Sequence, residues 1–251
     1  MCGIVGYTGT GQAKDVLLEG LKRLEYRGYD SAGIAVFDGD KLNIVKRLGK
    51  VSELVDAVSS DQCSGTCGIG HTRWATHGAP SERNAHPHTS CAGDIAVVHN
   101  GIIENFTELR EELIAKGHTF VSDTDTEVAA HLVEEGYNGN LLEAVRYAAS
   151  RLVGAYGLAV TCEQEPGTIV VTRKDSPIVL GSSEKGSYVA SDIIAVIEAT
   201  RDVVIMEDNQ FAVMTPSGIS YYNQQGEAIT PEITHVDWDI DVAEKVGYPD
   251  F

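Results

Sequence analysis

Basic residues and long apolar runs are scarce in this sequence, and each shortage argues against a class of protein. Only 19 lysine and arginine residues stand against 37 aspartate and glutamate residues, a formal net charge of -18. Proteins neutralise nucleic-acid phosphates with clustered lysine and arginine, so a nucleic-acid partner is not expected. No apolar run approaches the ~18 to 20 residues that cross a bilayer, and no secretory leader pattern opens the chain. We therefore expect a cytoplasmic protein with no membrane partner.

Cysteine is also sparse, and its distribution does not indicate a disulfide framework. The five residues are odd in number and unevenly spaced. Four of them are expected to be ordinary core or surface thiols: Cys63, Cys67, Cys91 and Cys162.

Cys2 differs from the other cysteines because of its position. Removal of Met1 would place the thiol beside a free α-amino group. A terminal amine titrates near pH ~8 and a free thiol near ~8.5, so a proton moves between them with little driving force. This pairing is the chemistry of an N-terminal nucleophile. A cysteine at position two also arises by chance, so the position alone does not show that Cys2 is a nucleophile. Residues elsewhere in the chain have to distinguish the two explanations.

The periodicity of apolar residues predicts an α+β fold. Helical spacing runs from Gln12 to Tyr26, from Phe106 to just before Gly117, from Thr124 to Gly136, and from Leu141 to near Gly154. Short β-rich runs predict strands at residues 4–8, 32–37, 41–46, 68–73, 95–100, 156–162, 168–172, 188–191 and 211–214. Short turns such as Asp38-Gly39-Asp40 favour antiparallel sheets with helices packed on them.

Local signals refine this outline. Asn105 is expected to cap one helix, and Thr124 with Glu127 has the spacing of a capping box at the next. The longest stretch without a pattern, from Ala75 to Gly93, is expected to be a functional loop. The acidic end of the chain lacks a core pattern, which indicates a chain cut from something longer.

Several residues suit the recognition of a free amino acid and attack on its side chain. Arg73 offers a bidentate fork for a carboxylate, Thr76 adds a hydroxyl, and Asp125 offers an anion for an ammonium group. Thiol attack on a carbonyl needs donors at the developing oxyanion, and Asn100 followed by Gly101 is a suitable pair. Taken singly, each residue also has an ordinary structural explanation as a surface ion pair, a helix-dipole acid or a tight turn.

Six ordered segments together resemble the glutaminase domain of the glucosamine-6-phosphate synthase family, within the class of N-terminal-cysteine glutamine amidotransferases. The resemblance spans almost the whole chain, and the wording around Arg27 and Arg73 favours this family over the purine-pathway amidotransferases. The segments are Cys2–Gly6, Leu24–Gly33, His71–Gly78, His86–His88, Asn100–Asn105 and Thr124–Glu127.

The resemblance implies a four-layer αββα sandwich of two antiparallel sheets, of the N-terminal nucleophile hydrolase type. It implies that Cys2 attacks the glutamine side-chain amide, that a thioester forms, and that water releases glutamate and ammonia. The α-amine of Cys2 would shuttle protons through a water. Asn100 and Gly101 would hold the oxyanion, and Arg27 would keep the surroundings of Cys2 in place.

For the substrate, the resemblance implies that Arg73, with Thr76 and His77 nearby, holds the carboxylate of glutamine. Asp125 would hold its ammonium group. Trp74 would lie where the glutaminase site meets a passage for ammonia, although a packed aromatic beside Arg73 explains it equally well.

The same resemblance sets expectations for partners and boundaries. The complete enzymes continue into sugar isomerase domains that use the ammonia to convert fructose 6-phosphate to glucosamine 6-phosphate in hexosamine biosynthesis, and they are expected to be homo-oligomers. We expect residues 1–235 to form the glutaminase domain and residues 236–251 to begin a linker to those domains. No cofactor and no metal are expected. The chain alone should hydrolyse glutamine without making glucosamine 6-phosphate.

Three other interpretations remain to be weighed. Five of the eight histidines lie close together in the sequence, which suggests a metal site: His71, His77, His86, His88 and His99. Their spacing does not match a known metal-binding motif. His77 or His99 could instead act as the base for Cys2 in a histidine-assisted cysteine hydrolase. A domain that binds glutamine without hydrolysing it would have to lack a nucleophile or an oxyanion donor, and both Cys2 and Asn100 are present.

Overall fold

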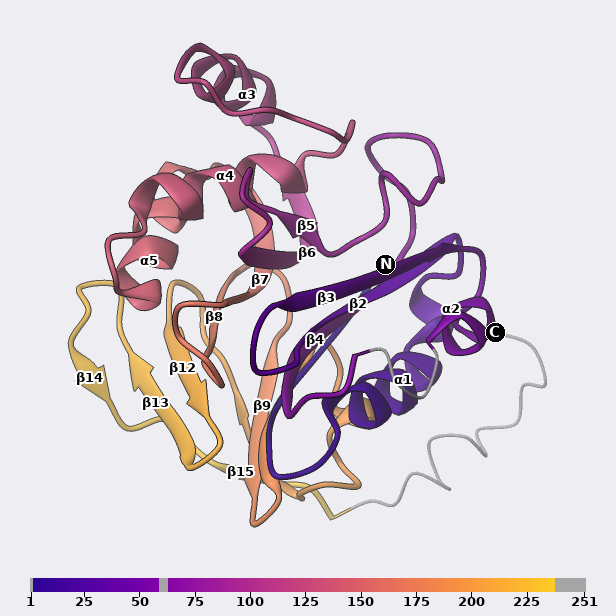
Figure 1. Cartoon of the computed structure of the whole chain (residues 1–251). Helices are drawn as coiled ribbons and strands as arrows, with labels where there is room; N and C mark the ends of the chain where they lie inside the picture. Colours follow the sequence, from indigo (N-terminus) through magenta and orange to yellow (C-terminus); the bar gives the residue numbers. More distant parts are fainter. Residues whose placement is uncertain (1, 59–62, 238–251) are drawn as a thin grey trace.

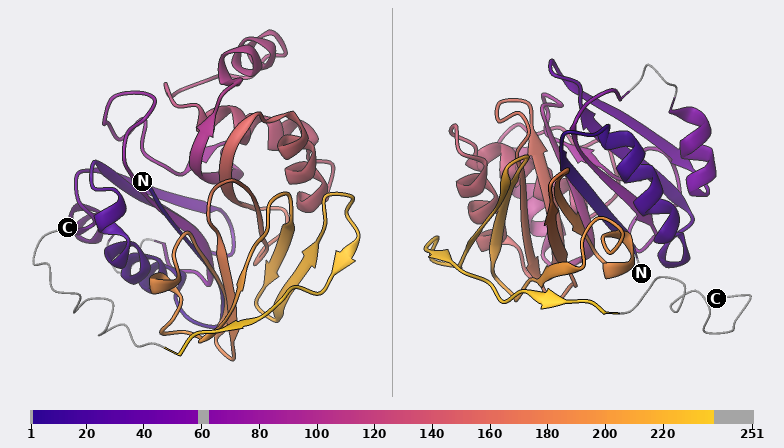
Figure 2. Two further views of the ribbon diagram at one scale, coloured as in Figure 1. Left: turned by 180° about the vertical axis from the view of Figure 1, so that it is seen from behind. Right: turned by 90° about the horizontal axis from the view of Figure 1, so that it is seen from below.

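Two antiparallel β-sheets lie face to face, with helices on both outer faces (Figures 1 and 2). The structure is a computed structural model that describes residues 2–58 and 63–237. The eight-stranded sheet has the order β15 (Thr234–His235), β11 (Asp202–Ile205), β9 (Val179–Ser183), β10 (Gly186–Ala190), β1 (Gly3–Gly9), β4 (Cys67–Arg73), β2 (Ser31–Phe37) and β3 (Leu42–Leu48). The seven-stranded sheet has the order β14 (Ala228–Ile229), β13 (Gly218–Tyr222), β12 (Phe211–Thr215), β8 (Ile169–Lys174), β7 (Gly154–Cys162), β6 (Ile95–Ile103) and β5 (His88–Thr89).

The helices divide between the two sheets. On the eight-stranded sheet lie α1 (Ala13–Arg23) and α2 (Val51–Ala57), with the short 3₁₀ turns η1 (Glu25–Arg27) and η2 (Ile193–Ala195) close to α1. On the seven-stranded sheet lie α4 (Thr126–Gly136) and α5 (Leu141–Arg151), while α3 (Phe106–Ala115) packs against α4 (Figure 1). This arrangement confirms the expected α+β fold with an αββα sandwich of antiparallel sheets.

Alternation along β1 explains how one strand serves two apolar layers. Ile4 faces the layer between the sheets, whereas Val5 and Tyr7 face α1, because successive side chains in a strand point to opposite faces. Leu17 of α1 is fully buried on that outer face. Each such side chain contributes roughly 1.5–3 kcal/mol when it is buried. The start of β1, and with it Cys2, is therefore fixed by packing on both faces.

Some expectations about local structure are wrong. Asn105 lies at the start of α3, but its side chain binds the Arg151 carbonyl and the Val153 amide instead of capping the helix. The capping box is also absent, because the Glu127 carboxylate accepts hydrogen bonds from the Val121 and Ser122 amides. Residues expected to end the first helix form η1, and several elements were not expected from the sequence: α2, β5, β9, β11, β13, β14 and β15.

The expected boundary near residue 235 is close to the end of the described chain. Val236 is 4% exposed and packs with the apolar cluster beneath α1, so the folded unit includes this residue. The rest of the expected linker, residues 238–251, lies outside the described residues, as does Met1. Of the helices that the structure describes, none combines the length and the apolar character needed to span a bilayer.

Candidate active site

Cys2 lies directly before β1, beside the end of β4. The two strands pair with Gly3 opposite Thr72, which brings Cys2 next to Trp74. The Trp74 amide donates to Cys2 Sγ at 3.2 Å, and Sγ lies 3.5 Å from the Trp74 carbonyl oxygen. Burial raises the pKa of the Cys2 thiol above its ordinary value, although the Trp74 amide partly offsets this. The thiol is therefore held in its neutral form near neutral pH, so that attack on a carbonyl requires a base.

Asn100 approaches Cys2 from β6 of the other sheet. Its Nδ2 donates to the Cys2 carbonyl oxygen at 3.0 Å, and its Oδ1 accepts from His71 Nε2 at 3.0 Å. Desolvation lowers the pKa of His71 to about 3, so its ring stays neutral. The histidine thereby fixes which end of the amide faces Cys2. His71 is a supporting residue to which the sequence analysis gave no such role.

Gly101 follows Asn100 with a backbone conformation that requires glycine. Its φ is +130°, and a Cβ atom there would lie 2.0 Å from the Ala155 carbonyl oxygen of β7. The tight pairing of β6 with β7 thus depends on this glycine. Asn100 and Gly101 lie at the Cys2 end of the sandwich, as two candidate oxyanion donors must.

Arg73 ends β4 on the same face as His71, because both have odd positions in the strand. Its Nη2 donates to the carbonyl oxygens of His77 and Gly78 at 2.5 and 2.9 Å, which ties the loop to the sheet. Asp30 lies 3.9 Å from Nη1, and within the described residues Nη1 is buried without a hydrogen-bond partner. A buried guanidinium with an unused donor is suited to receive a carboxylate.

Asp125 lies at the start of α4 and is 4% exposed. One carboxylate oxygen accepts from the Ile103 amide at 2.9 Å, and the same oxygen lies 3.9 Å from His77 Nδ1. The backbone bond orients the carboxylate. Asp125 therefore presents an oriented carboxylate to the same cavity that Arg73 lines.

A narrow cavity of about 20 Å³ joins most of the expected site residues. It includes Trp74, whose side chain is half exposed and meets the Tyr29 ring edge-on at 5.4 Å. Arg27 does not line the cavity; it forms an ion pair with Asp192 and a hydrogen bond to Tyr26 nearby. The lining residues are Cys2, Arg73, Trp74, Thr76, His77, His86, His99, Gly101, Thr124, Asp125 and Thr126.

Four of the clustered histidines form a buried polar layer behind this cavity. Thr126 Oγ1 lies 2.9 Å from His99 Nδ1 and 3.3 Å from His86 Nε2, while the rings of His71 and His86 stack at 4.0 Å. His88 Nε2 lies 3.0 Å from Thr124 Oγ1. Burial lowers the pKa of all four histidines. Three of these neutral rings bind threonines at or just before the start of α4, whereas His71 binds Asn100 and the His99 carbonyl oxygen. The group of potential metal ligands found among the described residues lies elsewhere.

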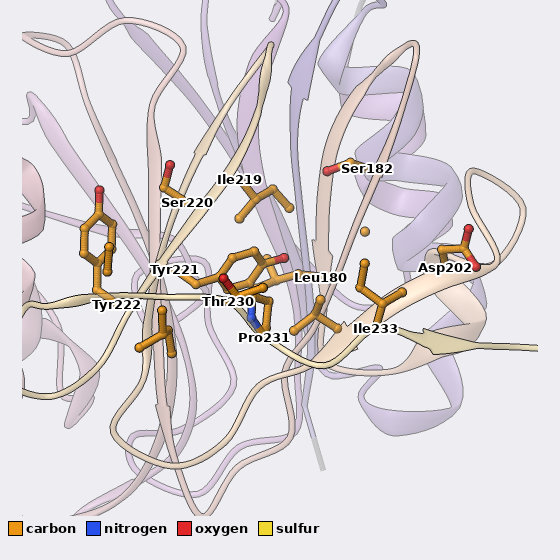
Figure 3. Close-up of a pocket in the computed structure, with 14 residues that line it drawn as sticks. Leu180, Ser182, Asp202, Ile219, Ser220, Tyr221, Tyr222, Thr230, Pro231 and Ile233 are labelled. Carbon is orange, nitrogen blue, oxygen red and sulfur yellow. The ribbon is translucent and has the colours of Figure 1, made fainter.

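A larger cleft of about 590 Å³ is lined by strands near one edge of each sheet, and Cys2 is not among its lining residues (Figure 3). It is lined from β9, β11, β13 and the segment after β14, and Asp202 is its one charged lining residue. Its lining includes hydroxyl side chains but no cysteine and no histidine that could act as their base, so its size does not make it the reactive site.

Comparison with known proteins identifies the class that this fold and site define. A solved structure of the glutamine phosphoribosylpyrophosphate amidotransferase from B. subtilis, complexed with ADP and GMP, matches 90% of this chain and 50% of that chain, with a TM-score of 0.79 and 27% identity. The sandwich is that of the N-terminal nucleophile amidotransferases.

Sequence comparison then gives the family. The profile of a glutamine amidotransferase domain matches residues 55–233. Glutamine--fructose-6-phosphate aminotransferases (isomerizing) from Clostridium tetani and Thermus thermophilus are 49% and 51% identical over all 251 residues. The chain belongs to the glutamine amidotransferase domain family. It spans 41% of the length of these relatives.

Proposed function

We propose that this chain hydrolyses glutamine to glutamate and ammonia through a thioester on Cys2. The observation that supports this most directly is that Cys2 and Gly101 line one cavity with the buried Arg73 and Asp125, while the Asn100 side chain donates to the Cys2 carbonyl oxygen. Glutamine would lie with its carboxylate on Arg73 and its ammonium on Asp125. Thr76 and His77 line the same cavity and would complete the substrate site.

In the proposed reaction the Cys2 thiol gives its proton to the freed α-amine of the same residue, directly or through a water. Sulfur then bonds to the side-chain carbonyl carbon of glutamine, and the carbonyl oxygen becomes an oxyanion. The Asn100 amide and the Gly101 backbone N–H would stabilise that charge, and one such donor is worth about 3 kcal/mol. The amine returns its proton to the leaving ammonia, and water hydrolyses the thioester to glutamate and the thiol.

Contacts of the thiol favour the α-amine over a histidine as the base. Within residues 2–58 and 63–237, the hydrogen bonds of Cys2 Sγ go to the Trp74 backbone alone. His99 is bound to Thr126, and burial lowers its pKa. His77 lies beside Asp125, where it would meet the substrate ammonium.

We further propose that this chain acts as the glutaminase domain of a longer enzyme, with a linker that begins after the buried Val236 and leads to sugar isomerase domains that receive the ammonia. The names of the relatives support fructose 6-phosphate as the acceptor of the nitrogen. Glucosamine 6-phosphate is the product that the motif resemblance implies. Trp74 is half exposed and lines the cavity, and we place it where ammonia would leave the site. Arg27 would hold the surroundings of Cys2 in position through its ion pair with Asp192.

An intact-mass measurement combined with a glutaminase assay tests the central proposal. Protein without Met1 should release glutamate from glutamine, and protein that retains Met1 should be inactive because its Cys2 amine is an amide. Cys2→Ala should abolish release, while glutamine binding measured by calorimetry is largely kept. Cys63→Ala is the matched control, since Cys63 lies in the apolar cluster beneath α1 and should leave turnover intact. Turnover by the Cys2→Ala variant would refute the thioester.

A further inference from the structure

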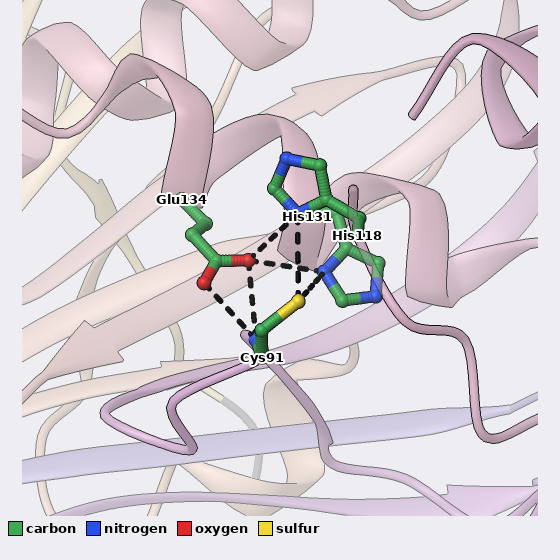
Figure 4. Close-up of side chains that lie close together, drawn as sticks. All are labelled: Cys91, His118, His131 and Glu134. Carbon is green, nitrogen blue, oxygen red and sulfur yellow. Dashed lines mark hydrogen bonds and ion pairs between the residues drawn. The ribbon is translucent and has the colours of Figure 1, made fainter. Parts of the chain in front are cut away.

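A cluster of four potential metal ligands lies outside the cavity of Cys2, where three segments meet (Figure 4). Cys91 comes from the turn between β5 and β6, His118 from the segment after α3, and His131 with Glu134 from α4. One ligand atom from each residue lies within 4.8 Å of the others. We propose that this cluster binds one Zn²⁺ ion in a structural site.

Four of the six separations between the ligand atoms are close to those around a tetrahedral zinc ion, and the other two are within 4.8 Å. Zinc bonds to sulfur at about 2.3 Å and to imidazole nitrogen at about 2.0–2.1 Å, so a tetrahedron places sulfur and nitrogen about 3.5 Å apart. Cys91 Sγ lies 3.5 Å from His118 Nδ1 and 3.6 Å from His131 Nδ1. Glu134 Oε2 lies 3.0 and 3.1 Å from the same two nitrogens, where zinc geometry requires about 3.3 Å.

The chemistry of the ligand set selects zinc over the hard cations. One thiolate, two imidazoles and one carboxylate make a four-ligand set of the kind that Zn²⁺ takes, whereas Mg²⁺ and Ca²⁺ prefer oxygen ligands. Binding breaks the Cys91 S–H bond, forms the zinc–sulfur bond, and releases the proton to water.

The surroundings of the two histidines supply an observation independent of the cluster itself. His131 is 1% exposed, and its other ring nitrogen, Nε2, lies 3.7 Å from Glu127 Oε1. His118 Nε2 lies 3.7 Å from Glu135 Oε1. Histidines that bind a metal commonly direct their second nitrogen to a carboxylate, which fixes the ring. In this chain both second nitrogens lie 3.7 Å from a carboxylate oxygen, beyond hydrogen-bond distance, and His131 Nε2 is buried without a hydrogen-bond partner within the described residues.

The backbone also supports a thiolate at Cys91. The Thr119 amide donates to Cys91 Sγ at 3.4 Å, and the Cys91 amide donates to both oxygens of Glu134 at 3.1 Å. The first bond stabilises negative charge on sulfur, and the second orients the carboxylate. A bound ion would therefore tie the β5–β6 turn and the segment after α3 to α4, the helix that begins next to Asp125.

The sequence gives no pattern from which this site could have been recognised. Cys91, His118 and His131 are far apart along the chain, and only His131 and Glu134 have a short spacing, one helical turn apart on α4. Of the five histidines considered as possible ligands, three bind threonines, His71 binds Asn100, and His77 lies beside Asp125.

Metal loading of the purified 251-residue chain tests the proposal. After treatment with a chelator and reloading, the protein should hold about one Zn²⁺ per chain, and its Tm should rise by about 5 °C or more. Co²⁺ in place of Zn²⁺ should give thiolate-to-metal absorption in the near ultraviolet, with the strong visible bands of tetrahedral cobalt. In the protein without substitutions, bound Zn²⁺ should lower the rate at which iodoacetamide alkylates Cys91 more than tenfold.

Variants then assign the ligands. Cys91→Ser should abolish the thiolate-to-cobalt absorption and weaken zinc binding at least tenfold, and Glu134→Gln should weaken binding without removing that absorption. His235→Gln is the matched control, because His235 is an exposed histidine that pairs with Asp202 outside the cluster. Substoichiometric zinc after reloading, equal alkylation of Cys91 with and without Zn²⁺, or cobalt bound without thiolate absorption would each overturn the proposal. The alkylation measurement needs no variant, so poor folding of a mutant leaves the test intact.

Discussion

A single guanidinium, that of Arg73, connects strand, loop and proposed substrate. It is 3% exposed, and one of its terminal nitrogens holds two loop carbonyls from His77 and Gly78. The other terminal nitrogen is buried beside Asp30 and lacks a hydrogen bond within the described part of the chain. Leaving a buried donor unsatisfied costs about 1–3 kcal/mol, and a substrate carboxylate would remove that cost.

Arg73→Lys is therefore expected to weaken glutamine binding at least tenfold, about 1.4 kcal/mol. Lysine keeps the positive charge beside Asp30 but loses the planar fork that reaches a loop carbonyl and a carboxylate at once. Calorimetry in a Cys2→Ala background measures the dissociation constant without turnover. Arg83→Lys is the control, since Arg83 is an exposed residue that pairs with Asp123. An unchanged dissociation constant in Arg73→Lys would show that this residue does not hold the carboxylate.

At the scale of the element, β6 carries both the proposed oxyanion donors and the pairing that positions them. Gly101 combines a φ of +130° with a Cβ position 2.0 Å from the Ala155 carbonyl oxygen. Any side chain there has to push β7 away. Gly139, between α4 and α5, has a φ of +97° with nothing within 4 Å of its Cβ position. Alanine at Gly139 would therefore meet backbone strain alone, whereas alanine at Gly101 would meet both backbone strain and steric overlap.

Gly101→Ala is expected to lower the free energy of unfolding by more than Gly139→Ala, which should cost about 1 kcal/mol through backbone conformation alone. It should also reduce kcat for glutamine hydrolysis at least tenfold, because the displaced amide no longer faces the oxyanion. Urea unfolding and steady-state kinetics on the two variants check this. Equal destabilisation with full activity in Gly101→Ala would mean that β6 tolerates the shift and that this amide is not a donor.

The elements show which parts of the fold the sequence predicts and which it does not. Long periodic segments such as α1 and α5 were expected close to their observed positions, because burial of one apolar face defines them locally. Short edge strands such as β14 and β15 escaped notice, because two residues have no periodicity and take their conformation from the neighbouring strand. The predicted capping box is absent because the Glu127 carboxylate accepts hydrogen bonds from the backbone amides of Val121 and Ser122, a few residues before the helix.

The site divides in the same way. Cys2, Arg73, Asn100 and Asp125 stood out because motif resemblance named them, and their roles stay proposals. His71 could not be assigned a role, since its contact with Asn100 crosses from one sheet to the other. Cys91 could not be linked to His118 and His131, because only packing of α4 against the β5–β6 hairpin brings them together. Contacts across sheets and between distant segments carry no local sequence signal.

At the scale of the whole molecule, the two sheets meet at their reactive end through buried histidines. His71 extends from β4, His99 from β6, and His86 stacks on His71 from the connecting loop. Each of these rings is buried, so the folded state disfavours their protonated forms. The unfolded chain has no such restriction and protonates its histidines near pH ~6.5. Proton uptake is therefore coupled to unfolding.

The expected consequence is acid sensitivity that begins well above the range in which carboxylates titrate. Because the pKa values of these histidines are lowered on folding, with His71 at about 3, their contribution to stability is complete above pH ~6.5 and falls as the pH drops below it. Each histidine adds a slope of up to about 1.4 kcal/mol per pH unit. The Glu127 carboxyl, whose pKa is lowered to about 2, contributes its full stability above its unfolded pKa near ~4.3 and loses it only as the pH falls below that value.

Urea unfolding at about pH 7.5, 6.5 and 5.5 measures this slope. His88→Gln should make the free energy of unfolding depend less steeply on pH, because about one proton fewer is taken up on unfolding. His88 is another buried histidine with a lowered pKa, at the edge of the same layer. His235→Gln, which removes an exposed histidine paired with Asp202, should not make that dependence less steep. A free energy of unfolding that stays constant between these pH values would mean that the buried rings take up protons in the folded state. The neutral histidine layer would then not be what orients Asn100 and the start of α4.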